Sequence, residues 1–460
     1  MRFGLLVYVV VPLSLCTSAV AASFRPRLVQ QIAAQTLPAS PGSEPDTLSQ
    51  PSVASDPADA RRVAAVFQEG RFPTGIGSIA LGTAASQDAG AHWTLGHVQG
   101  LTSVVAGTYD RAADNSIAFG PNREIYVISI ALDMCPDCSS VVAVQRSDDG
   151  GATFTAPVLV DDGAQGFNDK SWITADTFTA AASPHSGRVY AAWVRLSSGA
   201  SELASSDDGG VTWSPAEDAS APGRFTHGPI PVVQPNGDVT VVYWDKGPGT
   251  DTGPPYTVVS RTSHDGGSSF ATPVVVATFE PGDPGDLVEY EGPAATVDRA
   301  TGTLVVAWRG QRLSGPENDI FLSTSNDGGA TWNTPARVNR RQKRDCFMPA
   351  VAADNAVIHV TFSARVGNSV ETRHTASIDS GKTFAGERIV GRRSVLTYAA
   401  IASYPTPNRK FLGAYMGIAA AGGRTYAVWA RALRPPFASN VPCVAPTGLY
   451  HQTLWSSTIE

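Results

Sequence analysis

Short runs of β-branched, aromatic and small apolar residues recur along this chain, separated by clusters of glycine, proline and polar residues. Such runs are typical of β-strands, and none shows the 3.6-residue period of an amphipathic helix. The sequence therefore predicts an all-β protein. In each repeating unit the second strand is expected to be strongly apolar, and these second strands are predicted at residues 62–68, 124–131, 188–193, 238–244, 303–308, 357–362 and 424–429.

An eight-residue pattern follows the third predicted strand of six units. It reads Ser-x-Asp-x-Gly-x-Thr/Ser-Trp/Phe, with His92 replacing the hydroxyl residue in the first copy. The intervals between copies are 61, 59, 57, 62 and 52 residues, which indicates a repeat architecture. The Asp side chain can accept hydrogen bonds from following N–H groups, and the Gly permits a positive φ, so we interpret each copy as a hairpin turn rather than a ligand site. The copies begin at Ser86, Ser147, Ser206, Ser263, Ser325 and Ser377.

Units of four strands, none able to cover its own faces, predict a β-propeller with the repeated turn between the third and fourth strands. Seven blades are favoured, and six is the alternative if residues 23–98 do not form a full blade. The last unit, roughly residues 396–458, lacks a fourth strand, and segment 27–32 would supply it and cover the exposed sheet edge. The expected organisation is a signal peptide (1–22), a closing strand with a linker (23–50) and the propeller (51–460).

Composition restricts the possible partners. The net charge of -7 and the absence of a long basic run argue against nucleic acid. No internal apolar run approaches the roughly 18–20 residues needed to cross a membrane.

Arg2 precedes an apolar stretch, and Ala19-Val20-Ala21 is a small-x-small cleavage pattern. We therefore expect a signal peptide cut after Ala21 or Ala22 and an exported protein, either secreted or periplasmic.

Four cysteines follow the predicted signal peptide. In an exported protein disulfides are the default, so Cys135 is expected to pair with Cys138 across a hairpin tip, leaving Cys346 to pair with Cys443. No further ligands flank Cys135 and Cys138 at the spacing of a zinc site, and no helix follows them as in a redox Cys-x-x-Cys motif. No metal site and no cofactor are predicted.

The repeated turn resembles the Asp-box, or bacterial neuraminidase repeat, of sialidases and their relatives, over nearly the whole mature chain. Asn168-Asp169-Lys170-Ser171-Trp172 and segment 411–418 also resemble parts of exported bacterial sialidase-like proteins. The resemblance implies the sialidase-like propeller fold. It does not by itself define the activity, because Asp-boxes also occur in other glycan-cleaving enzymes, sorting receptors and assembly factors.

Candidate chemistry is expected on the face opposite the repeated turns, where first strands begin and second strands end. Arginines at matching positions in several units could converge on a carboxylate, because guanidinium groups bind carboxylates in bidentate fashion and sialic acid is an acidic sugar. The alternative is that each arginine neutralises a neighbouring acid on a wet surface. The four candidates for substrate binding are Arg195, Arg309, Arg365 and Arg431.

Catalytic candidates lie at the starts of first strands. By resemblance, a sialidase site would combine a Tyr–Glu pair with an Asp acid. Asp169 is the candidate acid, and Tyr398 or Tyr290 with Glu289 or Glu291 is the candidate pair. His227 is a candidate acid or base for another glycan chemistry, such as a lyase, although it could also be an ordinary polar residue at a strand end. The predicted catalytic set is Asp169, Glu291, Tyr398 and His227.

The chain departs from sialidases in one motif. They place Arg-Ile-Pro or Arg-Leu-Pro at the start of a first strand, and the equivalent here is Ser49-Gln50-Pro51. Arg71-Phe72-Pro73 is similar in spelling but lies past the expected second strand. Later units have His227-Gly228-Pro229, Glu291-Gly292-Pro293 and Phe347-Met348-Pro349 at this position.

The leading hypothesis is an exported sialidase-like glycoside hydrolase that acts on a terminal acidic sugar such as sialic acid. The alternatives are a non-catalytic propeller that binds glycans or proteins, a polysaccharide lyase on the same fold, and a structural scaffold. The basic residues at 337–344 could mark an anionic partner or a solvated loop. The oligomeric state stays open.

Overall fold

The structure is a computed structural model that describes residues 24–134, 139–283, 285–288, 292–312, 315–340, 344–402, 409–435 and 450–460. In these ranges the regular elements are β-strands, apart from two single-turn 3-10 helices, η1 (Ser103–Val105) and η2 (Leu396–Tyr398). The predicted all-β class is confirmed. No helix of the described chain is long and apolar enough to cross a membrane.

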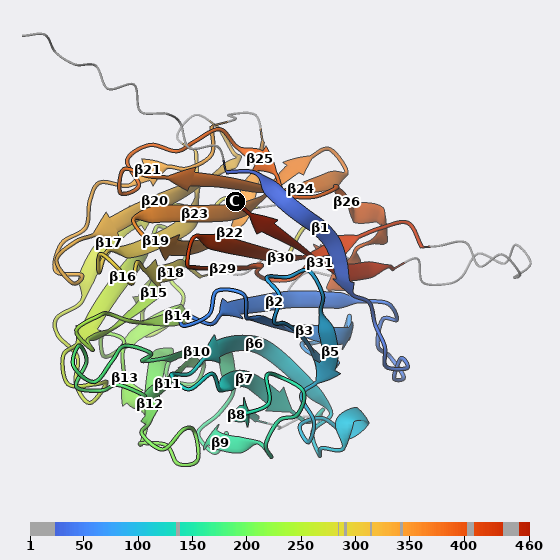
Figure 1. Ribbon diagram of the computed structural model, residues 1–460, viewed down its shortest axis with the longest axis horizontal. Coiled ribbons are helices and arrows are strands. Elements are labelled where there is room, and N and C mark those ends of the chain that lie inside the picture. The colour runs from blue at the N-terminus through green and yellow to red at the C-terminus, as the bar shows by residue number, and fades with distance from the viewer. Residues whose placement is uncertain are drawn as a thin grey trace, which may run out of the picture.

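Antiparallel sheets of four strands follow one another along the chain (Figure 1). The first three are β2 (Leu48–Ser55), β3 (Val63–Arg71), β4 (Ser78–Ser86) and β5 (Thr94–His97); β6 (Arg111–Phe119), β7 (Ile125–Leu132), β8 (Ser140–Ser147) and β9 (Val158–Asp161); and β10 (Asn168–Ala175), β11 (Val189–Arg195), β12 (Ala200–Ser206) and β13 (Glu217–Asp218). A single backbone pair, Ser78 with Ala112, joins the first two of these sheets.

The next three sheets repeat this order. They are β14 (Arg224–Val233), β15 (Val239–Pro248), β16 (Tyr256–Ser263) and β17 (Val274–Phe279); β18 (Ala294–Val297), β19 (Leu304–Gln311), β20 (Asn318–Ser325) and β21 (Ala336–Arg337); and β22 (Cys346–Asp354), β23 (Val357–Val366), β24 (Ser369–Ser377) and β25 (Arg388–Ile389). In addition, β26 (Ser394–Val395) pairs with β24, and β27 (Ala400–Ala402) pairs with β28 (Arg409–Phe411).

The last sheet contains both ends of the described chain. Its strands are β29 (Gly417–Ala421), β30 (Arg424–Ala432), β31 (Gln452–Ile459) and β1 (Pro26–Ala33). β1 runs antiparallel to β31, with Pro26 opposite Ile459 and Ala33 opposite Leu454. The N-terminal strand is therefore the fourth strand of this sheet, and it covers an edge that β31 would otherwise expose.

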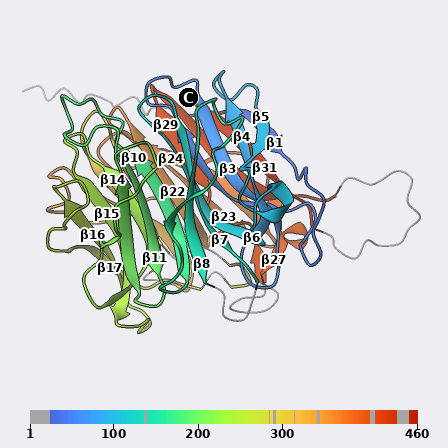
Figure 2. The ribbon, with the colours of Figure 1, turned by 90° about the horizontal axis from the view of Figure 1, so that it is seen from below.

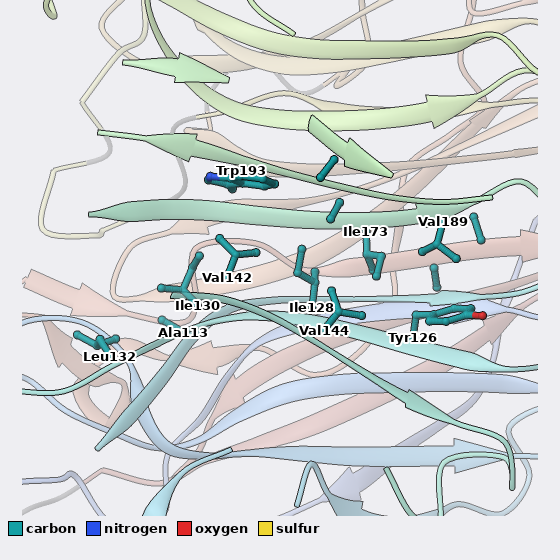
Figure 3. Close-up of a cluster of buried hydrophobic side chains, with 14 residues drawn as sticks. Ala113, Tyr126, Ile128, Ile130, Leu132, Val142, Val144, Ile173, Val189 and Trp193 are labelled. Carbon is teal, nitrogen blue, oxygen red and sulfur yellow. The ribbon is translucent and has the colours of Figure 1, made fainter. Parts of the chain in front are cut away.

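The first strands of neighbouring sheets contact one another in a cycle that runs β2, β6, β10, β14, β18, β22, β29 and back to β2. In the perpendicular view, strands of successive sheets lie side by side (Figure 2). Apolar side chains fill the space between sheets, as in the cluster formed by β6, β7, β8, β10 and β11, where Ile128 and Trp193 are fully buried (Figure 3). The predicted apolar second strands are β3, β7, β11, β15, β19, β23 and β30.

Each of the six repeated turns joins the third strand of a sheet to its fourth. In the copy that begins at Ser206, Asp208 Oδ1 accepts hydrogen bonds from the N–H groups of Val211 and Thr212, at 3.0 and 2.9 Å. Asp208 Oδ2 accepts the Thr212 hydroxyl at 2.6 Å. The hydrogen bonds from Thr212 lower the pKa of Asp208 to about 2. The carboxylate is thus used within its own turn.

Strand register places the repeated turns and the candidate chemistry at opposite ends of the sheets. Ser206, which begins a turn, pairs with Val189 at the start of β11. At the other end of β11, Arg195 pairs with Asn168, the first residue of β10. The starts of first strands and the ends of second strands therefore share one end, which we call the site face.

A buried histidine pair lies beside the N-terminal end of the described chain. His359 in β23 and His374 in β24 stack with ring centroids 5.3 Å apart, and His359 Nδ1 lies 3.1 Å from His374 Nε2. Phe24 packs edge-on against both rings. Burial lowers the pKa of His359 to about 4, and burial with the charge of His359 lowers the pKa of His374 well below its ordinary value.

The histidine pair should make the free energy of unfolding depend on pH. Unfolded histidines take up protons near pH 6.5, before the folded ones do, so the free energy of unfolding should fall as the pH drops from 6.5 towards 4. The expected loss is about 3 kcal/mol for His359 alone. Replacing both residues (His359→Gln, His374→Gln) should flatten this dependence in denaturant unfolding at several pH values. His264→Gln, at an exposed histidine, should keep it; a double variant with the original slope would contradict the assignment.

Candidate functional site

A β-bulge with positive φ interrupts the start of five first strands. The register of each strand shifts there, and the bulged residues are Gln50 (φ 49°), Asp114 (44°), Lys170 (54°), Gly228 (66°) and Met348 (48°). Four of them are not glycine. A bulge changes the direction of a side chain at a strand end, and left-handed backbone at residues other than glycine costs of order 1 kcal/mol or more and clusters at functional sites. The bulges therefore mark the site face as the place to look for chemistry.

Two of these bulges bring charged side chains together. Lys170 Nζ lies 3.5 Å from Asp114 Oδ2 and 3.3 Å from Asp169 Oδ1. The backbone N–H of Lys170 also donates to Asp114 Oδ2 at 3.1 Å. On the far side of Asp169, His227 Nε2 lies 3.5 Å from Asp169 Oδ2. We call Asp114, Asp169, Lys170 and His227 the central charged group.

The central charged group is enclosed but reachable from solvent. The side chain of Asp114 is 7% exposed, whereas those of Asp169 and Lys170 are 17% and 18% exposed. The His227 side chain is 12% exposed. Asp169 is therefore the more accessible of the two carboxyls, and Asp114 lies behind it.

The two carboxyls differ in proton affinity. Burial raises the pKa of Asp114 to about 6; the charge of Asp169 adds to this rise and Lys170 opposes it. Burial alone would also raise the pKa of Asp169, but Lys170, His227 and a hydrogen bond with Asp114 outweigh it and hold that pKa well below its ordinary value. Interacting carboxyls titrate as a pair. Up to about pH 6 the pair can therefore hold one proton on Asp114 while Asp169 is ionised, an arrangement suited to acid–base chemistry.

Two segments that resemble sialidase-like proteins meet beside this group. The ring of Trp172, from segment 168–172, lies 5.8 Å from the ring of Tyr415, from segment 411–418. The Tyr415 hydroxyl donates to the backbone oxygen of Asn115, next to Asp114, at 2.6 Å. Asn115 Nδ2 donates to the backbone oxygen of Gln50, the neighbouring bulge, at 3.0 Å. These contacts hold the bulged strands in register.

Arg71 is a further charged residue on the site face. The predicted second strand ended at residue 68, but β3 continues to Arg71 and carries it to this end of the sheet. Its guanidinium lies 3.6 Å above the ring of Phe411, and its Nε donates to the backbone oxygen of Ile401 at 3.5 Å. Burial lowers the pKa of Arg71 to about 10, opposed by the charges of Glu44 and Asp114. Arg71 is thus a buried cation whose field reaches the central charged group.

The four predicted substrate arginines have partners within or beside their own sheets. Arg195 pairs with Asp161 at 2.8 Å and Glu202 at 3.0 Å, which is the neutralising role given as the alternative. Arg365 pairs with Asp286 at 2.6 Å. Arg309 donates to the backbone oxygen of Gly282.

Arg431 lies above the Trp455 ring at 4.5 Å. The partners found for the four arginines are acids, backbone oxygens and aromatic rings, and they differ from one arginine to the next. Their convergence on one carboxylate therefore stays a prediction.

The structure places the remaining predictions separately. Tyr398 ends η2 and packs at the edge of an apolar cluster that includes Leu396 and Trp429; no hydrogen bond or ion pair within the described chain connects it to Asp169. Glu291, with Glu289 and Tyr290, lies outside the described residues, as do residues 1–22 and Cys135, Cys138 and Cys443. The thiol of Cys346 is buried and free within the described ranges. The disulfide and signal-peptide predictions remain predictions.

Asp114 and Lys170 are the members of the central group that the predicted site omitted. Their bulges lack the proline that follows Gln50 and Gly228, so the spelling of the motif does not reveal them. Their distance from the repeated turn does reveal them. Gln50 and Lys170 both lie 36 residues before the Ser of their repeated turn, and Asp114 lies 33 residues before the Ser of its own turn. Distance from the turn was the usable signal.

The described residues contain no group of three His, Cys, Asp or Glu side chains that could hold a metal ion. They do form a hollow of ≈ 720 Å³ on the opposite face, between the sheets of β14 and β18. Its lining is both polar and apolar and includes Asn236, His264 and Asp327, part of a repeated turn. Because Asp327 is held by hydrogen bonds within its turn, this hollow has less reactive chemistry than the central charged group.

Comparison with known proteins gives the family. The family model of the BNR repeat-like domain matches residues 201–430, half of the chain. The chain belongs to this sialidase-like BNR family. The resemblance found in the repeated turns is thereby confirmed. A search of curated proteins finds no match.

Several solved structures are similar to this BNR-family protein. The NanB sialidase from Streptococcus pneumoniae superposes with a TM-score of 0.51 at 11% identity, over 79% of this chain and 70% of that one. A leech intramolecular trans-sialidase gives 0.49 at 10% identity, over 77% and 69%. A Dyadobacter fermentans protein of unknown function gives 0.47 at 14% identity, over 94% and 99%. The NanB match, at this identity, shows a shared fold alone, consistent with a sialidase-like β-propeller.

The electrostatics of the central group can be tested through Lys170. Lys170→Met removes the ammonium group between the carboxyls, so the pKa values of both Asp114 and Asp169 should rise. Carbon-detected NMR of the aspartate carboxyls during a pH titration measures both. Lys382→Met, at an exposed lysine, is the matched control and should leave both unchanged. Identical titrations in the wild type and Lys170→Met would show that Lys170 does not act on this pair.

Proposed function

We propose that this BNR-family protein is an exported glycoside hydrolase that acts on a terminal acidic sugar, such as sialic acid. The observation that carries the proposal is the carboxyl pair of Asp114 and Asp169, bridged by Lys170 and contacted by His227. Glycoside hydrolysis needs a proton donor and a second group that acts as base or nucleophile. The pair and its neighbours supply titratable groups of this kind on the site face.

In the proposed mechanism Asp114 and Asp169 share the catalytic proton. Asp114, with a pKa of about 6, retains it before reaction. Asp169, the more exposed carboxyl, contacts the substrate, takes the proton from Asp114 and passes it to the leaving oxygen as the glycosidic bond breaks. A water molecule adds to the anomeric carbon, and the proton that it loses returns to the carboxyl pair. The role of Asp169 as acid is thus kept, with Asp114 behind it as the proton store. His227, on the other side of Asp169, orients that carboxyl.

Positive charge near the pair supports an acidic substrate. Lys170 stands between the carboxyls, and the buried guanidinium of Arg71 acts on Asp114. Cations in a site sheltered from water attract an anionic group more strongly than exposed cations do. A sugar that carries a carboxylate would therefore bind more tightly at this end of the sheets than a neutral sugar would.

The same proposal extends to architecture and location. We infer that the seven four-stranded sheets are the blades of a β-propeller and that the repeated turns are its Asp-boxes. The cycle of first-strand contacts and the turn hydrogen bonds support this inference. Export follows from the sequence of residues 1–22 and is part of the proposal. Processing before Phe24 would leave the ring that packs on the histidine pair.

A second candidate, a polysaccharide lyase, is favoured by the position of His227. A lyase needs a base to remove a proton next to a sugar carboxylate and a cation to neutralise that carboxylate. His227 beside Asp169, with Lys170 nearby, offers both functions. A lyase leaves an unsaturated product that absorbs ultraviolet light, whereas a hydrolase does not, so a single assay distinguishes them.

The mature protein should release the reporter from a fluorogenic sialoside or another acidic-sugar glycoside. Turnover should decline as the pH rises above about 6, because Asp114 then loses the shared proton. Asp169→Asn should lower kcat by roughly 10²–10⁴-fold. Asp162→Asn, at an exposed aspartate, is the matched control and should retain full turnover.

Absence of turnover above that of Asp169→Asn, on all acidic-sugar glycosides tried, would overturn the enzymatic proposal. Saturable binding of an acidic glycan without product, weakened by Lys170→Met, would then identify a non-catalytic binding protein. A product that absorbs ultraviolet light would assign the lyase instead.

A further inference from the structure

Six arginines lie in or beside the outer strands of the sheet formed by β22–β25. These outer strands, β24, β25 and β26, are labelled in Figure 1. We define the arginine patch as Arg340, Arg344, Arg373, Arg388, Arg392 and Arg393. The chain as a whole has a net charge of -7, so a local excess of positive charge is contrary to its average. The proposed glycosidase chemistry makes no use of these residues.

Three of the six arginines share one buried carboxylate. Glu371 in β24 has no exposed side-chain surface. Its carboxylate accepts hydrogen bonds from Arg344, Arg373 and Arg393, with the Arg393 Nη2 atom 2.6 Å from Glu371 Oε1. Arg373 also pairs with Glu387 at 2.9 Å. One fully buried acid thus fixes three guanidinium groups in place, and their charge exceeds that of the two acids.

The other three arginines add to this excess. Arg340, Arg388 and Arg392 are exposed, and within the described residues none forms an ion pair with an acid. Only the backbone N–H of Arg340 contacts an acid, Glu387, and this hydrogen bond holds segment 337–340 beside β25. The patch therefore contains six arginines and two acids. Three of the arginines, Arg340, Arg388 and Arg392, can bind an anion from solution.

The arginine patch reaches the site face. Glu371 pairs with Ala364 close to the hairpin between β23 and β24, at the end of the sheet where second strands finish. Arg431 Nε, at the end of β30, donates to the backbone oxygen of Arg393 at 3.2 Å. Burial and the charge of Arg392 together lower the pKa of Arg431 to about 10, so positive potential extends to that residue. An anion bound along the patch would continue towards the site face.

We propose that the arginine patch is a docking surface for an acidic polysaccharide, carboxylated or sulfated, separate from the central charged group. Guanidinium groups bind both carboxylate and sulfate through paired N–H donors. Arg393, which Glu371 holds in place, and the exposed Arg340, Arg388 and Arg392 can each contact an acidic group of a flexible chain. The exposed apolar neighbour of Arg388 is Ile389, not an aromatic ring on which a nucleic-acid base could stack.

The test measures polymer binding by the full mature chain, without reference to turnover. Fluorescently labelled dextran sulfate and polygalacturonate distinguish sulfate from carboxylate, uncharged dextran is the blank, and a single-stranded oligonucleotide tests the competing partner class. Wild type should bind at least one acidic polysaccharide, with an affinity that falls as salt rises. The triple variant Arg340→Ser, Arg388→Ser, Arg392→Ser should bind roughly tenfold more weakly at low salt.

Two further proteins make the result specific. The triple variant Arg27→Ser, Arg61→Ser, Arg123→Ser removes the same charge from exposed residues elsewhere and should bind like wild type. The triple variant Arg340→Lys, Arg388→Lys, Arg392→Lys keeps the charge and should retain most of the wild-type binding. This comparison separates loss of charge from misfolding.

Three results would overturn the proposal: no binding of either acidic polysaccharide, equal losses in both serine variants, or tighter binding of the oligonucleotide. If the triple variant Arg340→Ser, Arg388→Ser, Arg392→Ser loses polymer binding but keeps sialoside turnover, the patch is supported as a surface distinct from the catalytic group. Polymer binding without any turnover would leave the patch supported and the proposed hydrolase overturned.

Discussion

The antiparallel pairing of β1 with β31 is the interaction on which the rest of this structure depends. It gives the last sheet its fourth strand and joins residues from the two ends of the chain, with Arg25 and Glu460 bonded backbone to backbone. The first strand of that sheet, β29, contacts both β2 and β22. Without this sheet the cycle of first strands would be open. Segment 411–418, which continues into β29 and supports the bulges, would lose its support.

Closure matters to the site because no single sheet holds the central charged group. Asp114 comes from β6, Asp169 and Lys170 from β10, and His227 from β14. Their distances are set by how neighbouring first strands pack and by bulges at equivalent positions. The Tyr415 contact to Asn115 is made across this packing, 300 residues apart in the chain. A shared proton requires carboxyls held within hydrogen-bonding reach, so the chemistry depends on the geometry of the whole cycle.

Much of the fold could be predicted from the sequence. The apolar second strands and the repeated turns depend on local patterns, and segment 27–32 predicted β1. The site was less predictable. Arg195 is neutralised by Asp161, from β9 of the neighbouring sheet, and by Glu202, from β12 of its own sheet. The first pairing follows from packing between sheets and the second from strand register.

Asp114 and Lys170 lie at the starts of first strands, where charged residues are expected on the site face, but no local pattern favoured them over the other candidates. Their bulges arise without proline, and alignment by distance from the turn shows that they occupy similar positions. Arg71 was set aside because β3 extends three residues beyond its apolar core, where hydrogen bonding continues after the apolar pattern has ended. Backbone hydrogen bonding determines where a strand ends. The apolar pattern of the sequence predicts that end only in part, so the positions of charged residues at strand ends are hard to predict.

Substrate is predicted to bind on the site face, away from the repeated turns. Electron density from crystals soaked with sialic acid or a related acidic sugar would test this most directly. The predicted result is a sugar bound against Asp169, Lys170 and His227. A sugar bound instead in the hollow lined by Asn236, His264 and Asp327 would contradict the account, because it would place recognition among the turns.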